Sequence, residues 1–158
     1  MVDHLLPMIG DKEFVTVADV GAGPNALLHC EFATGAEVDF YPMDKRELSG
    51  VERQDMEALT YPDGFFDIVQ CINALDHTRN ARKALEELIR VSKEWVYIDC
   101  ALDQLTTSGG WHYWDAKEDG SFVSKTDRFD LKDYGFDIHY FNSGGERRYN
   151  RIVARLKK

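Results

Sequence analysis

The hydrophobic and polar positions follow strand-like and then helix-like periods in turn over the first part of the chain. Segments rich in β-branched and aromatic residues, with apolar residues at alternate positions or in short runs, predict strands. These segments are residues 13–20, 37–44, 51–54, 65–73 and 95–100. Two further segments have apolar residues three and four positions apart, which predicts helices over residues 25–33 and 80–92. Asn80 is the expected N-cap of the second helix.

The last part of the chain has a different pattern. Residues 103–130 show no clear period, and two strand-like segments follow at 136–141 and 150–157. The Gly-Gly turn between these two segments predicts an antiparallel hairpin. Strands that alternate with helices and end in a hairpin predict an α/β fold, a three-layer sandwich with a mostly parallel sheet of about seven strands. The length of 158 residues fits a single domain over residues 1–158.

Composition restricts the class of protein. With 44% hydrophobic and 30% charged residues, and without a membrane-spanning run or a signal peptide, the sequence predicts a cytoplasmic globular protein. The three cysteines are widely spaced and form no CxxC pair, so they indicate neither a disulfide framework nor a metal site. A net charge of −9 argues against a nucleic-acid partner and against an anionic membrane surface.

A glycine-rich turn follows the first predicted strand, in the sequence FVTVADVGAGPNALL. Gly21 and Gly23 allow a tight turn and a close approach of a ligand to the backbone, and in a parallel sheet this turn is a favoured ligand site. Asp44 follows Gly21 by 23 residues at the end of the second strand, where a carboxylate suits the hydroxyls of a ribose. Asp39 is the alternative ribose acceptor. Because GAGPNA also fits a dinucleotide fingerprint, an NAD-dependent oxidoreductase stays open at this point.

A second block separates the two classes of cofactor. Residues 54–93 read QDMEALTYPDGFFDIVQCINALDHTRNARKALEELIRVSK, with an acid next to an apolar residue, a L-x-x-P-D turn, a strand beginning FD and a helix ending in RV. Together with VADVGAGP, this block resembles the class I, Rossmann-like, S-adenosylmethionine-dependent methyltransferases from Val15 to about Ile98. The resemblance implies an enzyme that binds S-adenosyl-L-methionine and transfers its methyl group to an acceptor.

The resemblance also implies a cofactor site. Its residues would be Asp19, Gly21, Ala22 and Gly23 at the amino acid end, Asp44 at the ribose, Asp55 and Met56 at the adenine, and Asn73 beside the methionine moiety. The sequence departs from the family pattern at Asn25, which replaces the third glycine, and before residue 95, where a glycine pair is missing. Few residues precede the first strand, so we expect a small member that lacks most of the N-terminal helices. Its site would be open, or covered by the Trp-rich loop or by a neighbouring subunit.

Two features are candidates for the chemistry. His77, just beyond the end of a strand on the ligand side of the sheet, is the candidate general base; the alternative is a capping or backbone-bonding role. The segment GGWHYWD offers Trp111, His112 and Trp114 as contacts for a substrate, unless its tryptophans only fill the core. The Asn/Asp-Pro-Pro-Tyr signature and metal-ligand spacings are absent. We therefore expect a small-molecule acceptor and no metal, with a non-catalytic cofactor-binding partner subunit, or a homo-oligomer, as further possibilities.

Overall fold

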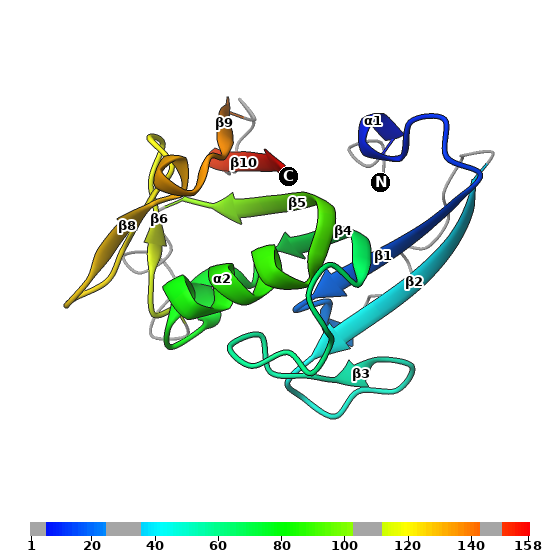
Figure 1. Ribbon diagram of the computed structural model, residues 1–158. Coiled ribbons are helices and arrows are strands. Elements are labelled where there is room, and N and C mark those ends of the chain that lie inside the picture. Colours follow the sequence, from blue (N-terminus) through cyan, green and yellow to red (C-terminus); the bar gives the residue numbers. More distant parts are fainter. Residues whose placement is uncertain (1–5, 25–35, 103–111, 143–149) are drawn as a thin grey trace.

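The computed structural model describes residues 6–24, 36–102, 112–142 and 150–158 (Figure 1). The predicted helix over residues 25–33 and the turn of the final hairpin lie outside the described residues. The elements are α1 (Leu6–Ile9), β1 (Phe14–Val20), β2 (Glu37–Asp44), β3 (Glu52–Arg53), β4 (Phe66–Ile72), η2 (Leu75–His77), α2 (Ala81–Val91), β5 (Ser92–Ala101), β6 (Asp115–Ala116), β7 (Ser121–Val123), β8 (Arg128–Asp130), η3 (Leu131–Tyr134), β9 (Asp137–Asn142) and β10 (Asn150–Lys157).

Seven strands form the central sheet, in the order β3-β2-β1-β4-β5-β10-β9. The first five strands of this order are parallel, while β10 runs antiparallel to both of its neighbours. The sheet order reverses between β1 and β4, so the carboxyl ends of these strands face a crevice where ligands bind in such folds. The predicted mostly parallel sheet with a final antiparallel hairpin is confirmed.

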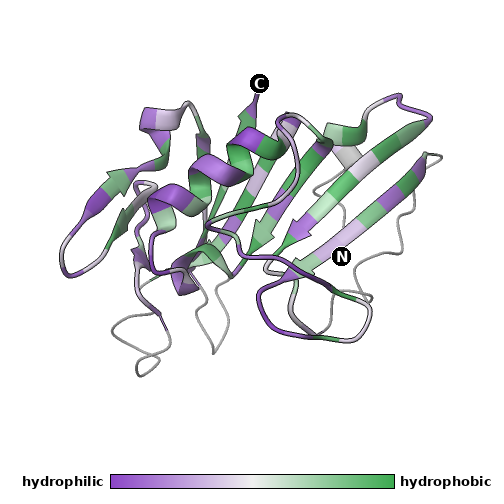
Figure 2. Cartoon of the chain, turned by 60° about the horizontal axis from the view of Figure 1, so that its bottom comes forward, coloured by the Kyte–Doolittle hydropathy of each residue, from purple (hydrophilic) through white to green (hydrophobic). Residues whose placement is uncertain are grey.

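Helix α2 covers one face of the sheet at β4 and β5 (Figure 1). It begins after Asn80, whose side chain accepts a hydrogen bond from the backbone N–H of Lys83, as predicted for an N-cap. Its apolar stripe, including Leu85 and Leu88, is fully buried in the larger core cluster. Figure 2 shows the resulting alternation of hydrophobic and hydrophilic residues along this helix, above strands that are mostly hydrophobic. Removal of this stripe from water stabilises the layer.

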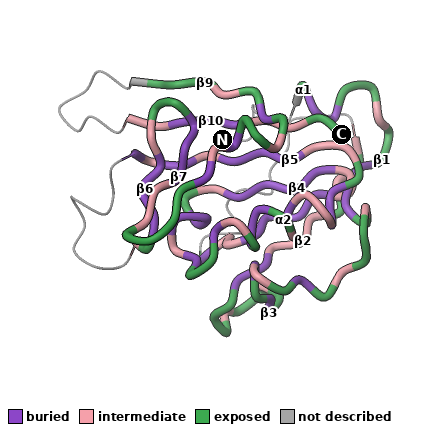
Figure 3. Tube along the Cα trace, turned by 60° about the vertical axis from the view of Figure 1, so that its left-hand side comes forward, coloured by how far each residue is buried: buried purple, intermediate pink, exposed green. Residues whose placement is uncertain are grey.

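The opposite face of the sheet has its own core cluster. Met8 and Ile9 of α1 pack there with Val15, Val17 and other apolar residues of the central strands. In Figure 3 the central strands are largely buried, while β9 at the edge is exposed. Apolar residues therefore face both sides of the sheet, as expected for a parallel sheet covered on both faces.

A small antiparallel sheet, β6-β7-β8, lies within the region that showed no period in the sequence. Its strands have only two or three residues each, too few for an alternation to be visible. Phe122 and Phe129 stack across it, with ring centroids 5.3 Å apart. Both residues belong to the same core cluster as α2, so this sheet extends the layer on that face.

The segment between β3 and β4 contains no helix, and α2 holds it in place. Arg90 donates to the carbonyl oxygens of Leu59 and Tyr61 at 2.9 and 2.8 Å. Glu87 accepts from the backbone N–H of Leu59 at 2.8 Å and pairs with Arg90 at 2.8 Å. These charge-assisted bonds satisfy backbone groups that a helix would otherwise satisfy internally.

Candidate cofactor and acceptor site

A pocket of about 630 Å³ lies at the carboxyl ends of the central strands. This volume is within the range of about 300–1,000 Å³ that is usual for small-molecule sites. The residues that line it are Val20, Gly21, Asp44, Lys45, Arg46, Gln54, Asp55, Met56, Glu57, Asn73, Ala74, His77, Thr78 and Tyr113. Of the predicted cofactor residues, Gly21, Asp44, Asp55, Met56 and Asn73 are in this lining, together with the predicted base His77.

The glycine turn joins the ends of three strands. The backbone N–H groups of Gly21 and Ala22 both donate to the carbonyl oxygen of Met43 at the end of β2, at 2.8 and 2.9 Å. Gly21 has φ +83°, and a Cβ atom there would lie only 2.3 Å from the Cβ of Ala74, just beyond β4. Glycine is therefore required at this position on two independent grounds, backbone conformation and space.

Asp44 is an anionic group in the pocket lining, at the predicted ribose position. Its carboxylate accepts from the backbone N–H of Gly23 at 3.1 Å and from the backbone N–H of Arg46 at 2.9 Å. The guanidinium of Arg46 also donates to both carboxylate oxygens, at 2.9 and 2.8 Å. These bonds to Arg46 lower the pKa of Asp44, so the group is ionised at neutral pH. Asp39 is exposed on β2, outside the pocket lining, and accepts from the hydroxyl of Tyr41 at 2.7 Å.

Asp19 lies at the end of β1 behind the pocket lining. Its side chain is almost completely buried, and burial raises its pKa to about 6, opposed by a hydrogen bond from Gln70. A carboxylate kept in this environment carries a cost in stability, which is common at functional sites. Of the other predicted cofactor residues, Ala22 and Gly23 belong to the turn itself, and neither they nor Asp19 are part of the lining.

The predicted adenine side consists of two neighbouring residues with different environments. Asp55 is exposed and accepts from the backbone N–H of Glu57 at 2.9 Å, which closes a local turn. Met56 is buried, with its sulfur 3.9 Å from that of Cys71. An acceptor and a polarizable apolar surface therefore lie side by side at this end of the pocket.

Asn73, which lines the pocket just beyond the end of β4, has a left-handed backbone conformation with φ +50°. Its side-chain oxygen accepts from the backbone N–H of Ala101 and from the guanidinium of Arg151, both at 3.2 Å. Asparagine is one of the few residues that adopt this conformation at low cost. This local geometry turns the chain from β4 into η2, which carries the next two functional candidates.

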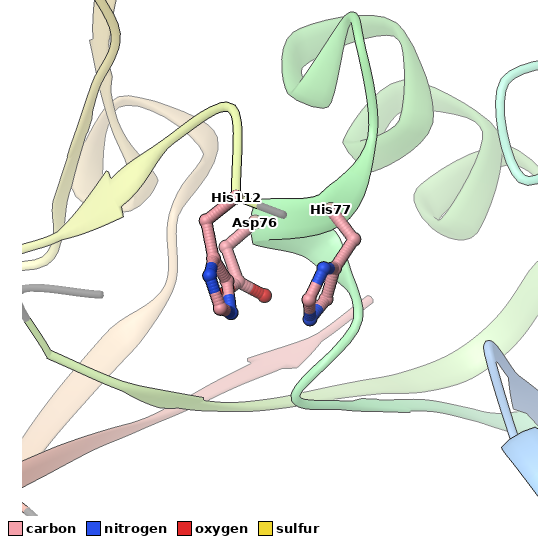
Figure 4. A group of neighbouring side chains, drawn as sticks. All are labelled: Asp76, His77 and His112. Carbon is pink, nitrogen blue, oxygen red and sulfur yellow. The ribbon is translucent and has the colours of Figure 1, made fainter. Parts of the chain in front are cut away.

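Asp76, His77 and His112 form a cluster beside the pocket (Figure 4). The Nε2 atom of His112 lies 3.3 Å from a carboxylate oxygen of Asp76, and the two imidazole rings are 4.1 Å apart. Burial raises the pKa of Asp76, and burial lowers the pKa of His112. The sequence pointed to both histidines but not to Asp76, for which only its place next to His77 was a signal.

The Trp-rich segment divides between core and pocket. Trp111 lies outside the described residues, and His112 belongs to the cluster just described. Trp114 is buried in the core, with its ring 5.4 Å from that of Phe129. Tyr113, which is half-exposed, lines the pocket in its place. The core-filling alternative therefore describes Trp114 better than a substrate contact does.

The sheet order, the glycine turn and the acid at the end of β2 define a nucleoside-cofactor fold of the class I methyltransferase type. A family model described as a methyltransferase domain matches residues 18–98, more than half of the chain. The chain belongs to this methyltransferase family, a class of S-adenosylmethionine-dependent enzymes, and the oxidoreductase alternative is not favoured. Comparison with curated protein sequences gives no match.

Solved structures share the fold over nearly the whole chain. An S-adenosylmethionine-dependent methyltransferase from Aquifex aeolicus is 18% identical, with 98% of this chain and 88% of that chain covered and a TM-score of 0.59. A chain from the complex of the Haloferax volcanii Trm112 methyltransferase activator with a candidate methyltransferase is 14% identical, with coverages of 98% and 86% and a TM-score of 0.63. The [4+2]-cyclase SpnF is also 14% identical, with coverages of 94% and 76% and a TM-score of 0.60.

At these identities the likeness concerns the fold alone, and the cyclase illustrates that one fold supports different reactions. The acceptor must therefore be argued from the residues of this chain. Among its described helices, none combines the length and the apolar character needed to cross a lipid bilayer.

Proposed function

We propose that this protein binds S-adenosyl-L-methionine in the pocket of about 630 Å³ and methylates a small-molecule acceptor. One observation carries the proposal. Five residues that the family resemblance assigned to the cofactor, from four separate segments of the chain, line a single pocket at the switch point of the sheet: Gly21, Asp44, Asp55, Met56 and Asn73.

The polar and apolar groups of the pocket fit such a cofactor. Asp44 offers a carboxylate to the two hydroxyls of a ribose, and Asp55 offers an acceptor to the amino group of an adenine. Met56 offers an apolar surface beside that acceptor. The absent Cβ of Gly21 leaves the turn close to the pocket without steric conflict. Behind the lining, the buried carboxylate of Asp19 favours a positively charged group nearby.

Arg46 adds a condition to cofactor binding. The four hydrogen bonds on the Asp44 carboxylate use about all of its acceptor capacity, and three of them come from Arg46. A ribose can bind to Asp44 only after the guanidinium has moved away. The side chain of Arg46 is 57% exposed, so solvent is available to receive it.

The bound cofactor would supply a methyl group that is carried on a sulfonium sulfur. A nucleophile would accept this methyl group, while the electron pair of the S–C bond stays on the sulfur, which becomes a neutral sulfide. The chain's own residues would hold the acceptor in line, which supplies much of the rate for such a displacement. His77 lines the pocket beyond Asn73, where an acceptor hydroxyl or amine can give up its proton. Tyr113 offers a half-exposed aromatic surface to the acceptor. The net charge of −9 favours a small acceptor over a nucleic acid.

Titration calorimetry with the demethylated cofactor, S-adenosyl-L-homocysteine, tests the binding. We expect Asp44→Ala to weaken binding about 10- to 100-fold, the range for a lost hydrogen bond to a charged group. Asp39→Ala is the matched control, since it removes a carboxylate from the same strand outside the pocket. No binding by the wild-type chain, or a larger loss in Asp39→Ala, would refute the assignment. Methyl transfer from labelled cofactor to a panel of small hydroxyl and amine compounds tests the proposed methylation of a small-molecule acceptor.

A further inference from the structure

We propose that Asp76, His77 and His112 bind a divalent transition-metal ion, for which zinc is the best match. Two imidazoles and one carboxylate are a ligand set that zinc and non-haem iron sites share, and imidazole nitrogen is a preferred zinc ligand. The sequence did not indicate this site, because its ligands come from η2 and from the segment before β6 and have no characteristic spacing. The role of the ion in catalysis rests on the proposed function, whereas binding of the ion does not.

The distances are close to those of a metal site. The ligand atoms of the three residues all lie within 4.8 Å of one another. Ligand atoms around a tetrahedral zinc ion at about 2.0–2.1 Å are separated by about 3.4 Å. The contact of 3.3 Å between His112 Nε2 and Asp76 Oδ2 already has this separation. Rotations that bring the remaining pairs closer by up to about 1.4 Å would complete the site. Figure 4 shows all three side chains directed into the same space.

The backbone holds the two segments together independently of any ion. The N–H groups of Tyr113 and Trp114 both donate to the carbonyl oxygen of Asp76, at 2.9 and 3.2 Å. The N–H of His77 donates to the carbonyl oxygen of Ala74 at 3.1 Å, which closes the η2 turn. The three ligands are therefore brought together before an ion arrives, and a preformed site reduces the ordering that binding requires.

The charges around the cluster also favour a cation. Asp76 and Asp115 are both buried carboxylates, and their negative charges interact unfavourably. Lys117 approaches Asp115 at 3.4 Å, while Asp76 faces His112 and the thiol of Cys100, whose sulfur is 4.0 Å from the other carboxylate oxygen. Buried charges are normally paired or bound to metal ions, and a divalent ion at Asp76 would offset both carboxylates.

Three protein ligands leave a coordination position open, as in catalytic zinc sites. Since His77 also lines the pocket, we expect a hydroxyl oxygen of the acceptor to take that position. A divalent ion lowers the pKa of a bound hydroxyl, so its proton leaves to solvent water. The oxygen lone pair then forms the O–C bond to the methyl group, while the S–C bond breaks and its electron pair remains on sulfur. The acceptor class is thereby narrowed to hydroxyl compounds, and His77 acts as a ligand instead of a base.

Metal binding by the full chain tests the site directly. After treatment with a chelator and dialysis, zinc chloride is titrated calorimetrically, and cobalt chloride is added to record the visible absorption of tetrahedral Co²⁺. We expect one bound zinc ion per chain. His112→Ala should weaken zinc binding by more than about tenfold and remove the Co²⁺ bands, since changes even outside the ligand shell cost 10- to 100-fold.

His139→Ala is the matched control. His139 forms an exposed pair with Asp137 on β9, at 3.0 Å, outside the cluster. Its removal deletes a histidine paired with an aspartate and should leave zinc binding unchanged. His77→Ala provides a second ligand variant, in case His112→Ala folds poorly by circular dichroism. Absence of stoichiometric zinc binding in the wild-type chain, or equal binding by wild type and both ligand variants, overturns the proposal.

The same samples are titrated with S-adenosyl-L-homocysteine, so the two proposals fail separately. Loss of zinc binding in the ligand variants with cofactor binding retained supports the metal site and leaves the cofactor site intact. Zinc binding without cofactor binding refutes the proposed function but not the metal site. Cofactor binding and methyl transfer in metal-free protein, unaffected by added zinc, overturn the catalytic role of the ion and return His77 to the role of general base, whereas the zinc titration alone decides whether the ion binds.

Discussion

Replacement of Asp19 by asparagine should make the protein more stable at alkaline pH while it weakens cofactor binding. The Asp19 side chain is only 3% exposed, and burial raises its pKa from an ordinary value of 3.8 to about 6. The folded state therefore holds this proton more tightly than the unfolded chain does. Between about pH 4 and pH 6, the free energy of unfolding falls as pH rises, because the buried group must ionise.

The magnitude follows from the shift in pKa. One pKa unit corresponds to about 1.4 kcal/mol, so a shift from 3.8 to about 6 corresponds to at most about 3 kcal/mol above pH 6. Asparagine keeps the shape of the side chain without the charge. At pH 8, the free energy of unfolding of Asp19→Asn should exceed that of the wild type by up to this amount, which is equivalent to a rise in Tm of about 6–12 °C for a chain of this size. Below pH 4, where both states are protonated, the gain should approach zero.

Urea denaturation at pH 8 and at pH 3.5, followed by circular dichroism, measures the gain where it should be largest and where it should approach zero. Asp39→Asn is the control, since an exposed substitution on the neighbouring strand should change stability by less than about 0.5 kcal/mol. If Asp19→Asn is no more stable than wild type at pH 8, or if its gain is the same at both pH values, ionisation of Asp19 is not the cause. Calorimetry with S-adenosyl-L-homocysteine should show the accompanying loss of affinity.

Three further substitutions test other parts of the structure. Arg46→Ala should tighten S-adenosyl-L-homocysteine binding about two- to fivefold by calorimetry, because an ion pair of up to about 1 kcal/mol no longer competes for Asp44; Arg53→Ala, outside the pocket, should not, and weaker binding in Arg46→Ala would contradict the competition. Gly21→Ala should cost more than about 2 kcal/mol in urea denaturation, since a Cβ would lie 2.3 Å from Ala74. Gly10→Ala, with φ +58° but no atom within 4 Å, should cost only about 1 kcal/mol, and equal losses would refute the steric argument. Arg90→Ala should cost about 1–3 kcal/mol by the same assay through its lost bonds to Leu59 and Tyr61, whereas a loss as small as that of Arg53→Ala would show that these bonds contribute little.

The elements with long periodic patterns could be predicted from the sequence. Strand β10 lies at the predicted residues, and α2 and β2 agree within one residue of the predicted bounds. Their signals are local, because alternation and the i, i+3, i+4 stripe arise from one element packed on one face. The small sheet of β6, β7 and β8 was not predicted, since its strands form through pairing with one another and with the core around Phe122.

That Gly21, Asp44, Asp55, Met56 and Asn73 meet at one pocket could likewise be predicted, because these residues follow strand ends and match the family motif. The acceptor side could not, since it depends on contacts between distant segments. The proximity of Asp76 and His112 arises from hydrogen bonds between segments 36 residues apart. The engagement of Asp44 by Arg46 depends on a side-chain rotamer that no pattern of residue types specifies.

The Asp44–Arg46 ion pair gives cofactor binding an unusual dependence on ionic strength. When a ribose replaces the guanidinium, an attraction between opposite charges inside the protein is exchanged for bonds to neutral hydroxyls. Dissolved salt screens the first of these and hardly affects the second. For a ligand without net charge, such as S-adenosyl-L-homocysteine, added electrolyte therefore shifts the exchange toward the occupied pocket. The free protein thus contains its own competitor, and the composition of the surrounding solution sets how strongly that competitor acts.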